Sequence, residues 1–537
     1  MAVLCGLNHT RSLRACICSR STRSKYYQLS FQSIKIGKER TAETVDQSRS
    51  SRLAHYAAAT ALFLLLALCL CPPARSDVGV VLNDPLDEGM ARITASGHSS
   101  VYFSRICSDT PLKLRLCGPG EEGSVLSNYQ NYGEDVEYEW NIVPLSVYLY
   151  GVNDPRSRTL LGLEKVKGLL EQNYRSTVLA DYCSVPKCSE NKRANWKDAV
   201  GATLARTVYI FIVKTTVEQD LELIAKFNSL PNESHFNAFT NNCANFTKNV
   251  IDTYFPNSVH GDFVNDFGMT SPKAVARSFT RYALRHPESE FRIEHYPQIP
   301  GDIKRTSDPR SGTEQMYHSP QWLVPMAIFA SHEMPFIFLS YNLTGRFNSD
   351  HEFQEHPTAR STELDNEIRA AKSEKDSARV DELKDEKDEE RANTLGTSDE
   401  WDDYREQFEA IVNEAIHDEV IRKRKSLREF ARHLDRDGTP VLDGQGNLWV
   451  EIQDGEKMLR VGMTSKNIFA PGSDPRLAYE LLLAHVDTVL RSHAHTRETM
   501  LQFKDNWSLL QQAHAESAGL HASGEKSGSA PSFLQNQ

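Results

Sequence analysis

Several features that would place this chain in a large class of proteins are missing from its sequence. No run of about 20 apolar residues occurs, so a protein with several membrane spans is excluded. Glycine and proline form no repeat, which excludes collagen-like and elastic chains. The net charge of −11 argues against a general nucleic-acid binder, whose binding domain is basic. No CxxC pair is present, so we expect no structural zinc site. We also expect no other metal and no cofactor.

The N-terminal region differs from the rest in charge and in apolar pattern. Residues 1–56 hold ten Lys and Arg against three Asp and Glu. An apolar run of 15 residues follows at 57–71 and ends in two prolines. A basic flank, a short apolar run and small residues before Asp77 predict a signal peptide over 57–76, cleaved after Ser76. An uncleaved signal anchor is the alternative.

The basic leader is too long for the flank of a signal peptide. We therefore interpret residues 1–56 as a start-site artefact, with translation beginning near Leu53, or as an organellar transit segment rich in Arg and Ser. The signal predicts an exported protein, periplasmic or extracellular, with anchoring by an uncleaved 57–71 helix as the alternative. We set residues 1–76 apart from the fold.

Composition divides the remaining chain into four parts. Residues 77–362 contain most of the strand patterns. Residues 363–398 form a charged helical or disordered linker, in which 363–391 holds twelve acidic and seven basic residues. Residues 399–515 are predicted to be a helical appendage with a small β-meander, and residues 516–537 a disordered tail.

The patterns within 77–362 predict an α+β domain. Alternation over 98–107 and 112–117, around the turn SDTP, indicates a β-hairpin. The dense β-branched and aromatic run at 206–216 predicts a strand, and 217–230 has helical spacing. Further strands are expected at 123–129, at 137–150 and in two late runs within 320–347.

Five cysteines lie outside the leader and signal: Cys107, Cys117, Cys183, Cys188 and Cys243. An odd number leaves at least one free thiol in an exported protein. Cys183 and Cys188 flank a short loop and could pair. In the predicted hairpin, Cys107 and Cys117 each end a strand, about five residues or roughly 16 Å apart. A disulfide needs Cα atoms within about 7 Å, so these two are predicted not to pair.

The leading candidate for chemistry is Cys243. Apolar residues recur at every fourth position after it and predict a helix: Phe246, Val250 and Tyr254. Asn241 or Asn242 is a suitable N-cap, which places Cys243 in the first turn, where the helix dipole favours a thiolate. A buried, unreactive cysteine at a helix start is the alternative.

A histidine at a predicted strand start completes a pattern with this cysteine. His98 follows Ala-Ser-Gly and opens the strand GHSSVYFSRIC, and Cys243 lies in FTNNCANFT. Together the two motifs resemble the circularly permuted papain-like superfamily, which includes NlpC-like amidases, lecithin–retinol acyltransferase-like proteins and exported bacterial members of unknown function. In that superfamily a GH opens a strand and an NC opens a helix, in this order. The resemblance covers about residues 90–350.

The resemblance implies a fold, a mechanism and a class of substrate. The fold would be a permuted papain-like antiparallel sheet packed on a Cys-bearing helix. Cys243 would attack an acyl carbonyl, and His98 would take and return the proton. The substrate would be an amide or ester of the cell envelope, in a peptidoglycan peptide, lipoprotein or lipid. NCANF replaces the NCEHF usual in the acyltransferase branch, so retinoid or phospholipid transfer has no specific support.

Several alternatives stay open at this point. A non-enzymatic envelope binding or scaffold protein would keep the fold with an inert Cys243. His235 is a second candidate for the base. The motif LLLAHVDTV at 481–489 resembles a zinc-binding motif of aminoacylases, but we interpret it as a chance match on a helix. The group that would orient the imidazole has three candidates on one predicted strand face: Glu137, Glu139 and Asn141.

Overall fold

The computed structural model describes the part of the chain that holds the predicted site. The described residues are 75–86, 97–128, 139–180, 196–233, 237, 240–304, 306–318, 332, 334–491 and 497–522. All of them belong to one compact unit within residues 72–537. The predicted leader, the apolar signal segment and most of the predicted tail lie outside the described residues.

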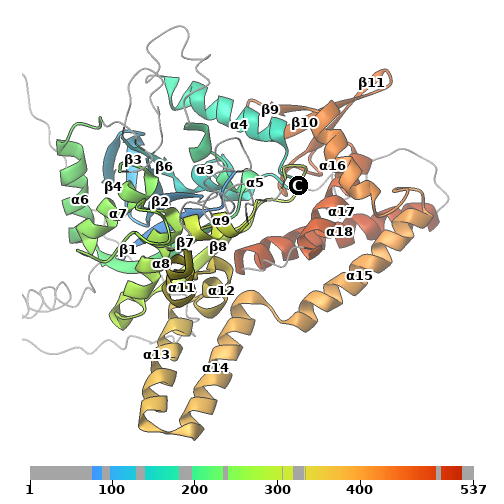
Figure 1. The fold of residues 1–537 in the computed structure, drawn as a ribbon. Coiled ribbons are helices and arrows are strands. Elements are labelled where there is room, and N and C mark those ends of the chain that lie inside the picture. The colour runs from blue at the N-terminus through green and yellow to red at the C-terminus, as the bar shows by residue number, and fades with distance from the viewer. Residues whose placement is uncertain are drawn as a thin grey trace, which may run out of the picture. The chain divides into compact units, whose positions relative to one another are not determined.

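A six-stranded antiparallel sheet with strand order β6-β5-β2-β1-β7-β8 organises the first part of this unit (Figure 1). The strands are β1 (Arg75–Asn83), β2 (His98–Phe103), β5 (Ser124–Ser127), β6 (Asn141–Pro144), β7 (Val208–Thr216) and β8 (Arg292–Tyr296). β1 and β7 are adjacent interior strands, and residues 78–82 and 208–213 are apolar apart from Gly79, as expected of strands buried on both faces. The predicted α+β class is confirmed.

Helices cover both faces of this sheet. One face carries α6 (Val217–Ser229), α7 (Cys243–Tyr254) and α8 (Pro272–Ala283). The other carries α3 (Leu145–Tyr150) and α5 (Ala202–Ala205). Side chains alternate between the two cores along each strand, so that Val80 belongs to the α7 side and Val81 to the α3 side. The predicted helix at 217–230 and the strand at 206–216 are confirmed.

The prediction that Cys107 and Cys117 cannot pair is wrong. The strand expected over 98–107 ends at Phe103, and a second strand, β3 (Ile106–Thr110), begins three residues later. β3 pairs with β4 (Lys113–Leu116), and this register places Cys107 opposite Arg115. Cys107 therefore lies at the start of its strand, and its Cα is 4.8 Å from that of Cys117, to which it is joined by a disulfide.

Two other strand predictions are corrected. Within 137–150, strand β6 ends at Pro144 and helix α3 follows directly. The later part of 320–347 forms α11 (Met334–Ser340) and a π-helical turn, Tyr341–Gly345, instead of a strand. A short apolar run fits a buried strand or a buried helix equally well, which explains both errors. Residues 320–331 lie outside the described part.

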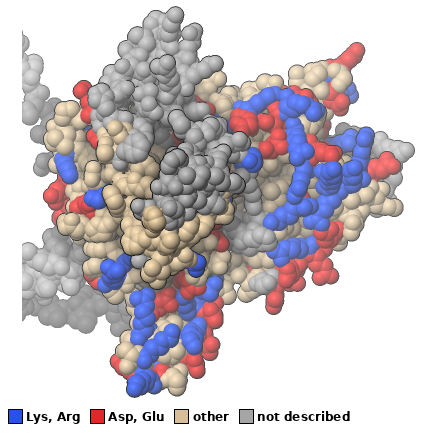
Figure 2. All heavy atoms as spheres, viewed as in Figure 1, with Lys and Arg blue, Asp and Glu red and all other residues tan. Residues whose placement is uncertain are grey.

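The charged stretch forms a helical hairpin of α13 (Ala359–Glu374) and α14 (Ser377–Leu395). Figure 2 shows acidic and basic side chains interspersed over its surface. The few apolar residues of this segment form a buried seam between the two helices: Leu364, Ile368, Ala371, Val380 and Leu383. This seam explains why so charged a segment is helical.

The rest of the chain forms helices around a small sheet. The elements are α15 (Ser398–His417), α16 (Ser426–Asp437), β9 (Thr439–Leu442), β10 (Leu448–Asp454), β11 (Lys457–Gly462), α17 (Pro475–Arg491) and α18 (Arg497–Ala522). Strands β9, β10 and β11 are the predicted meander. Their core also contains Leu163, which precedes α4 (Glu164–Thr177), Leu170 of α4 and Leu204 of α5. The predicted boundary at residue 362 remains a prediction, but side chains from both sides of it share this core.

The shared core predicts how two substitutions behave. Leu163→Ala and Phe408→Ala each remove a fully buried side chain and should lower the free energy of unfolding by about 2–5 kcal/mol. Both should shift the same unfolding transition, measured by urea denaturation with far-UV circular dichroism. Leu221→Ala, at a half-exposed position of α6, is the control and should change little. Separate transitions, each shifted by one variant, would show two independent units.

Candidate active site

Cys243 is the first residue of helix α7, as predicted. Asn242 is the N-cap and forms a reciprocal capping box with Asn245. The Nδ2 atom of Asn242 donates to the carbonyl oxygen of Thr270 at 3.1 Å, which ties the helix start to the loop before α8. Residues Phe246, Val250 and Tyr254 of α7 are buried against the sheet, so the helix cannot rotate about its axis.

The thiol of Cys243 faces the beginning of β2. Helix α7 packs on β2, and the backbone and hydroxyl of Ser99 and the N–H of Ala244 each lower the pKa of Cys243. One turn along the helix, Thr247 Oγ1 donates to Ser99 Oγ at 3.2 Å. Cys243 is the free cysteine among the described residues, whereas Cys183 and Cys188 lie outside them.

Burial and the helix N-terminus act on this thiol in opposite directions. Burial is the larger effect and raises the pKa of Cys243, while the N–H groups of Ser99 and Ala244 and the positive charge of Arg206 oppose it. Cys243 is therefore a neutral thiol at neutral pH. The sequence-based expectation of a thiolate counted the dipole and omitted the desolvation.

His98 is the first residue of β2, next to Ser99. Gly97 precedes it with φ +75°, and a Cβ at Gly97 would lie 2.1 Å from the carbonyl oxygen of Asn83, so the turn requires glycine. The Nε2 atom of His98 is inaccessible to solvent. Burial, and then the charge of Arg206, hold the pKa of His98 well below its usual range, so the imidazole is neutral.

The strand directs His98 and Ser99 to different faces of the sheet. Ser99 faces α7, as its contact with Thr247 shows. His98 is the cross-strand partner of Asn83, whose Nδ2 donates to Tyr148 Oη at 2.5 Å on the α3 side. Because partners in an antiparallel pair project from the same face, the Cβ of His98 also points to the α3 side. The start of α7 therefore lies against Ser99, the residue after His98. To contact the sulfur of Cys243, the imidazole of His98 would have to rotate around the end of β2.

Arg206 links the two predicted residues electrostatically. It follows α5, is buried, and donates from Nη2 to the carbonyl oxygen of Asp198 at 3.1 Å. Its positive charge lowers the pKa of both Cys243 and His98. A charge felt by both groups places them at the same end of the sheet.

A row of buried polar side chains crosses the α3 face beside His98, and the sequence patterns did not reveal it. Ser127 Oγ donates to Ser100 Oγ at 2.9 Å, and Ser100 Oγ lies 3.5 Å from Tyr148 Oη. Asn141 is the cross-strand partner of Ser127 and is fully buried. Its side-chain amide has no hydrogen-bond partner within the described part of the chain.

This row bears on the three candidates for the orienting group. Asn141 lies on the face to which His98 is directed. Glu139 precedes β6, its carbonyl oxygen accepts from Asn128 Nδ2 at 2.6 Å, and burial raises the pKa of its carboxyl group. Glu137 and the alternative base His235 lie outside the described residues.

Asp84 is an acidic residue of the same sheet end that the sequence analysis missed. It follows Asn83, its N–H donates to the carbonyl oxygen of Thr207 at 3.0 Å, and its Oδ2 accepts from Thr306 Oγ1 at 2.9 Å. Burial, opposed by that hydrogen bond, raises the pKa of Asp84 to about 7. The available signal was the apolar run VGVVL followed by Asn-Asp, which marks a strand with a polar end.

The zinc-like motif near the C-terminus is part of helix α17, in agreement with the helical interpretation. His485 lies 2.8 Å from the carbonyl oxygen of Leu160 through Nδ1 and 2.9 Å from Asn506 Nδ2 through Nε2. Asp487 forms ion pairs with Arg424 and Arg491. These contacts give both residues a structural role.

Comparisons with known proteins add no information about this site. The chain matches no family model, no curated protein and no solved structure. Within the described ranges, no helix combines the length and apolar character needed to cross a membrane.

The raised pKa of Cys243 predicts its alkylation behaviour. Iodoacetamide should modify Cys243 more slowly in the folded protein than in urea, because the thiolate fraction is smaller at each pH. The rate in the folded protein should still rise above about pH 9, where a free thiol approaches full ionisation. Peptide mapping by mass spectrometry from about pH 6 to about pH 10 measures it. A rate that reaches its plateau at a lower pH in the folded protein than in the unfolded chain would show that the helix dipole outweighs burial.

The raised pKa of Asp84 predicts a pH-dependent stability. The folded state keeps a proton that the unfolded state releases between about pH 4 and about pH 7, so the free energy of unfolding should fall as pH rises through this window. Asp84→Asn should reduce that fall, measured by urea unfolding at several pH values. Asp381→Asn, at an exposed position of α14, is the matched control and should leave it unchanged. An equal fall in all three proteins would contradict the assignment.

Proposed function

We propose that this chain is an exported thiol hydrolase or acyltransferase that acts on an amide or ester of the cell envelope. Cys243 is the nucleophile and His98 the general base. The observation that supports this most is the position of Cys243 at the first residue of α7, a helix that packs on β2, the strand that His98 opens.

The likeness to permuted papain-like proteins belongs to this proposal. It is supported by an antiparallel sheet, by a strand opened by Gly-His and by a later helix opened by Asn-Cys that packs on that strand. The free thiol and the imidazole occur on the elements, and in the chain order, that the resemblance implies.

General-base catalysis would start from the neutral imidazole and neutral thiol that burial favours, and substrate binding would have to reverse the pKa shifts that make His98 a weak base and Cys243 a weak acid. A neutral imidazole accepts the proton of Cys243 as the sulfur attacks the acyl carbonyl, and the N–H groups of Ser99 and Ala244 stabilise the thiolate. The C–S bond forms, and the C–N or C–O bond breaks. His98 returns the proton to the leaving amine or alcohol, and water or a second acceptor then takes the acyl group from the thioester.

Two observations favour an alternative, a non-enzymatic binding or scaffold protein with an inert thiol. Burial raises the pKa of Cys243 instead of lowering it. The strand also directs the Cβ of His98 to the face away from α7. For the enzyme, the imidazole must swing around the strand end when substrate binds.

Acylation by a simple activated ester tests the proposal. With p-nitrophenyl acetate, the protein should release nitrophenol and carry an acetyl group on Cys243, detected by peptide mapping. Cys243→Ala should abolish this acylation. His98→Asn should slow it by roughly 10²- to 10⁴-fold, the usual contribution of a general base.

Matched controls separate the two hypotheses. His433→Asn changes a half-exposed histidine of α16 and should leave the rate unchanged. Thermal unfolding of His98→Asn checks that the variant is folded. Acylation of Cys243 at equal rates in the wild-type protein and in folded His98→Asn would remove His98 from the mechanism, and no acylation of Cys243 would favour the binding protein.

A further inference from the structure

A second site lies at the other end of helix α7. A cavity of about 390 Å³ is lined by the loop that follows α7, residues 257–264, and by α8 with the turn after it. Because α7 has 12 residues, its last turn is about 16 Å from Cys243 along the axis. The volume falls within the range of about 300–1,000 Å³ that is usual for small-molecule sites.

Basic side chains dominate the lining of this cavity. Arg277 and Arg281 are one turn apart on α8, and Arg285 follows four residues later. Among the described lining residues, Asp262 is the acidic one, and it forms an ion pair with Arg277. The three arginines recur at every fourth position and line one cavity, so their side chains lie along one wall. Burial, and then the positive charges of Arg277 and Arg285, lower the pKa of Arg281, while Asp262 and Glu352 oppose this shift.

Two buried polar atoms in this lining lack partners. Ser258 is 3% exposed and Arg277 is 8% exposed. Neither Ser258 Oγ nor Arg277 Nε has a hydrogen-bond partner among the residues that the structure describes. A buried donor without a partner costs free energy, and both atoms lie beneath the accessible surface of the lining. Arginines near the end of α8 would also favour its dipole, but that role does not explain these two atoms.

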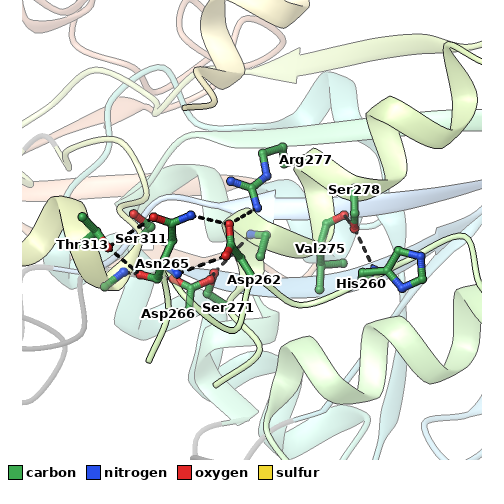
Figure 3. Close-up of polar contacts among 12 residues, drawn as sticks. His260, Asp262, Asn265, Asp266, Ser271, Val275, Arg277, Ser278, Ser311 and Thr313 are labelled. Carbon is green, nitrogen blue, oxygen red and sulfur yellow. Dashed lines mark hydrogen bonds and ion pairs between the residues drawn. The ribbon is translucent and has the colours of Figure 1, made fainter. Parts of the chain in front are cut away.

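A polar network holds the walls of the cavity in place (Figure 3). Asp262 lies between Arg277 and Asn265, whose Nδ2 donates to Asp262 Oδ2 at 2.7 Å. On the other side, Ser278 Oγ accepts from the backbone N–H of His260 at 3.0 Å. The loop and α8 are therefore connected on both sides of Arg277, and the guanidinium group is held before any ligand binds.

We propose that this cavity binds a phosphate group carried on a small organic molecule. Guanidinium groups present several N–H donors that match phosphate oxygens, and three of these groups belong to residues that line this cavity. The rings of Tyr282 and His286 stack with centroids 4.1 Å apart and form an aromatic wall of the cavity. The organic part of the ligand would lie against this wall. Free phosphomonoesters and phospholipid headgroups both carry this group.

Calorimetric titration of the full-length protein with glycerol phosphate, and sedimentation with phosphatidic acid vesicles against phosphatidylcholine vesicles, test the site. Arg281→Gln with Arg285→Gln should weaken binding at least tenfold, since each lost charge-assisted hydrogen bond is worth about that factor. Both arginines are exposed, so the fold should tolerate the change. Arg422→Gln with Lys425→Gln, also exposed, removes the same charge elsewhere and should have no effect.

Each outcome decides the proposal. Glycerol phosphate binding that is lost in the double arginine variant supports the site and assigns a free phosphomonoester. Binding to phosphatidic acid vesicles alone, lost in the same variant, supports it and assigns a lipid headgroup. The proposal is overturned if neither probe binds, or if binding survives in the double arginine variant or falls equally in the Arg422/Lys425 control.

Discussion

The pairing of β1 with β7 is the constraint on which the described fold and its candidate site depend. The two strands pair along all nine residues of each, in the interior of a sheet covered by helices on both sides. Gly79 allows this approach, because a Cβ there would lie 2.9 Å from Ile210 Cγ2 and 3.0 Å from the carbonyl oxygen of Phe211. The last residues of β1 also pair with the first residues of β2, with Asn83 opposite His98. The position of β1 in the sheet therefore determines where Asn83, Asp84 and His98 lie.

At that sheet end, desolvation is stronger than the local electrostatic effects. The N-terminus of α7 and the charge of Arg206 both favour a thiolate at Cys243, yet burial raises its pKa. The same environment keeps His98 neutral and Asp84 protonated at mildly acidic pH. Three ionisable groups at one end of the sheet are therefore uncharged together below about pH 7. A catalytic role requires that substrate binding changes this balance, whereas a binding role does not.

The sequence predicted elements that local pattern determines and missed those that tertiary register determines. The strand at 206–216, the helix at 217–230 and the N-cap before Cys243 follow from side-chain type and spacing. The disulfide did not, because it depends on a break between β2 and β3 that alternation alone does not show. The buried polar row was invisible for a similar reason: serine and asparagine at strand positions appear solvent-exposed until their partners across the sheet are known. Of the site, the sequence placed Cys243 and His98 on their elements but not the face to which His98 points.

Strand β1 was missed because it begins inside the segment assigned to the signal, and this gives the proposed cleavage a structural consequence. Arg75 and Ser76 pair with β7, and the hydroxyl of Ser76 donates to Asp220, a buried carboxylate that also accepts from Tyr254 Oη of α7 at 2.8 Å. Cleavage after Ser76 would remove one of these two donors, and burial already raises the pKa of Asp220. A signal cut at this position would therefore leave Asp220 with the Tyr254 donor, and the strand would remain anchored by the pairs from Asp77 to Asn83.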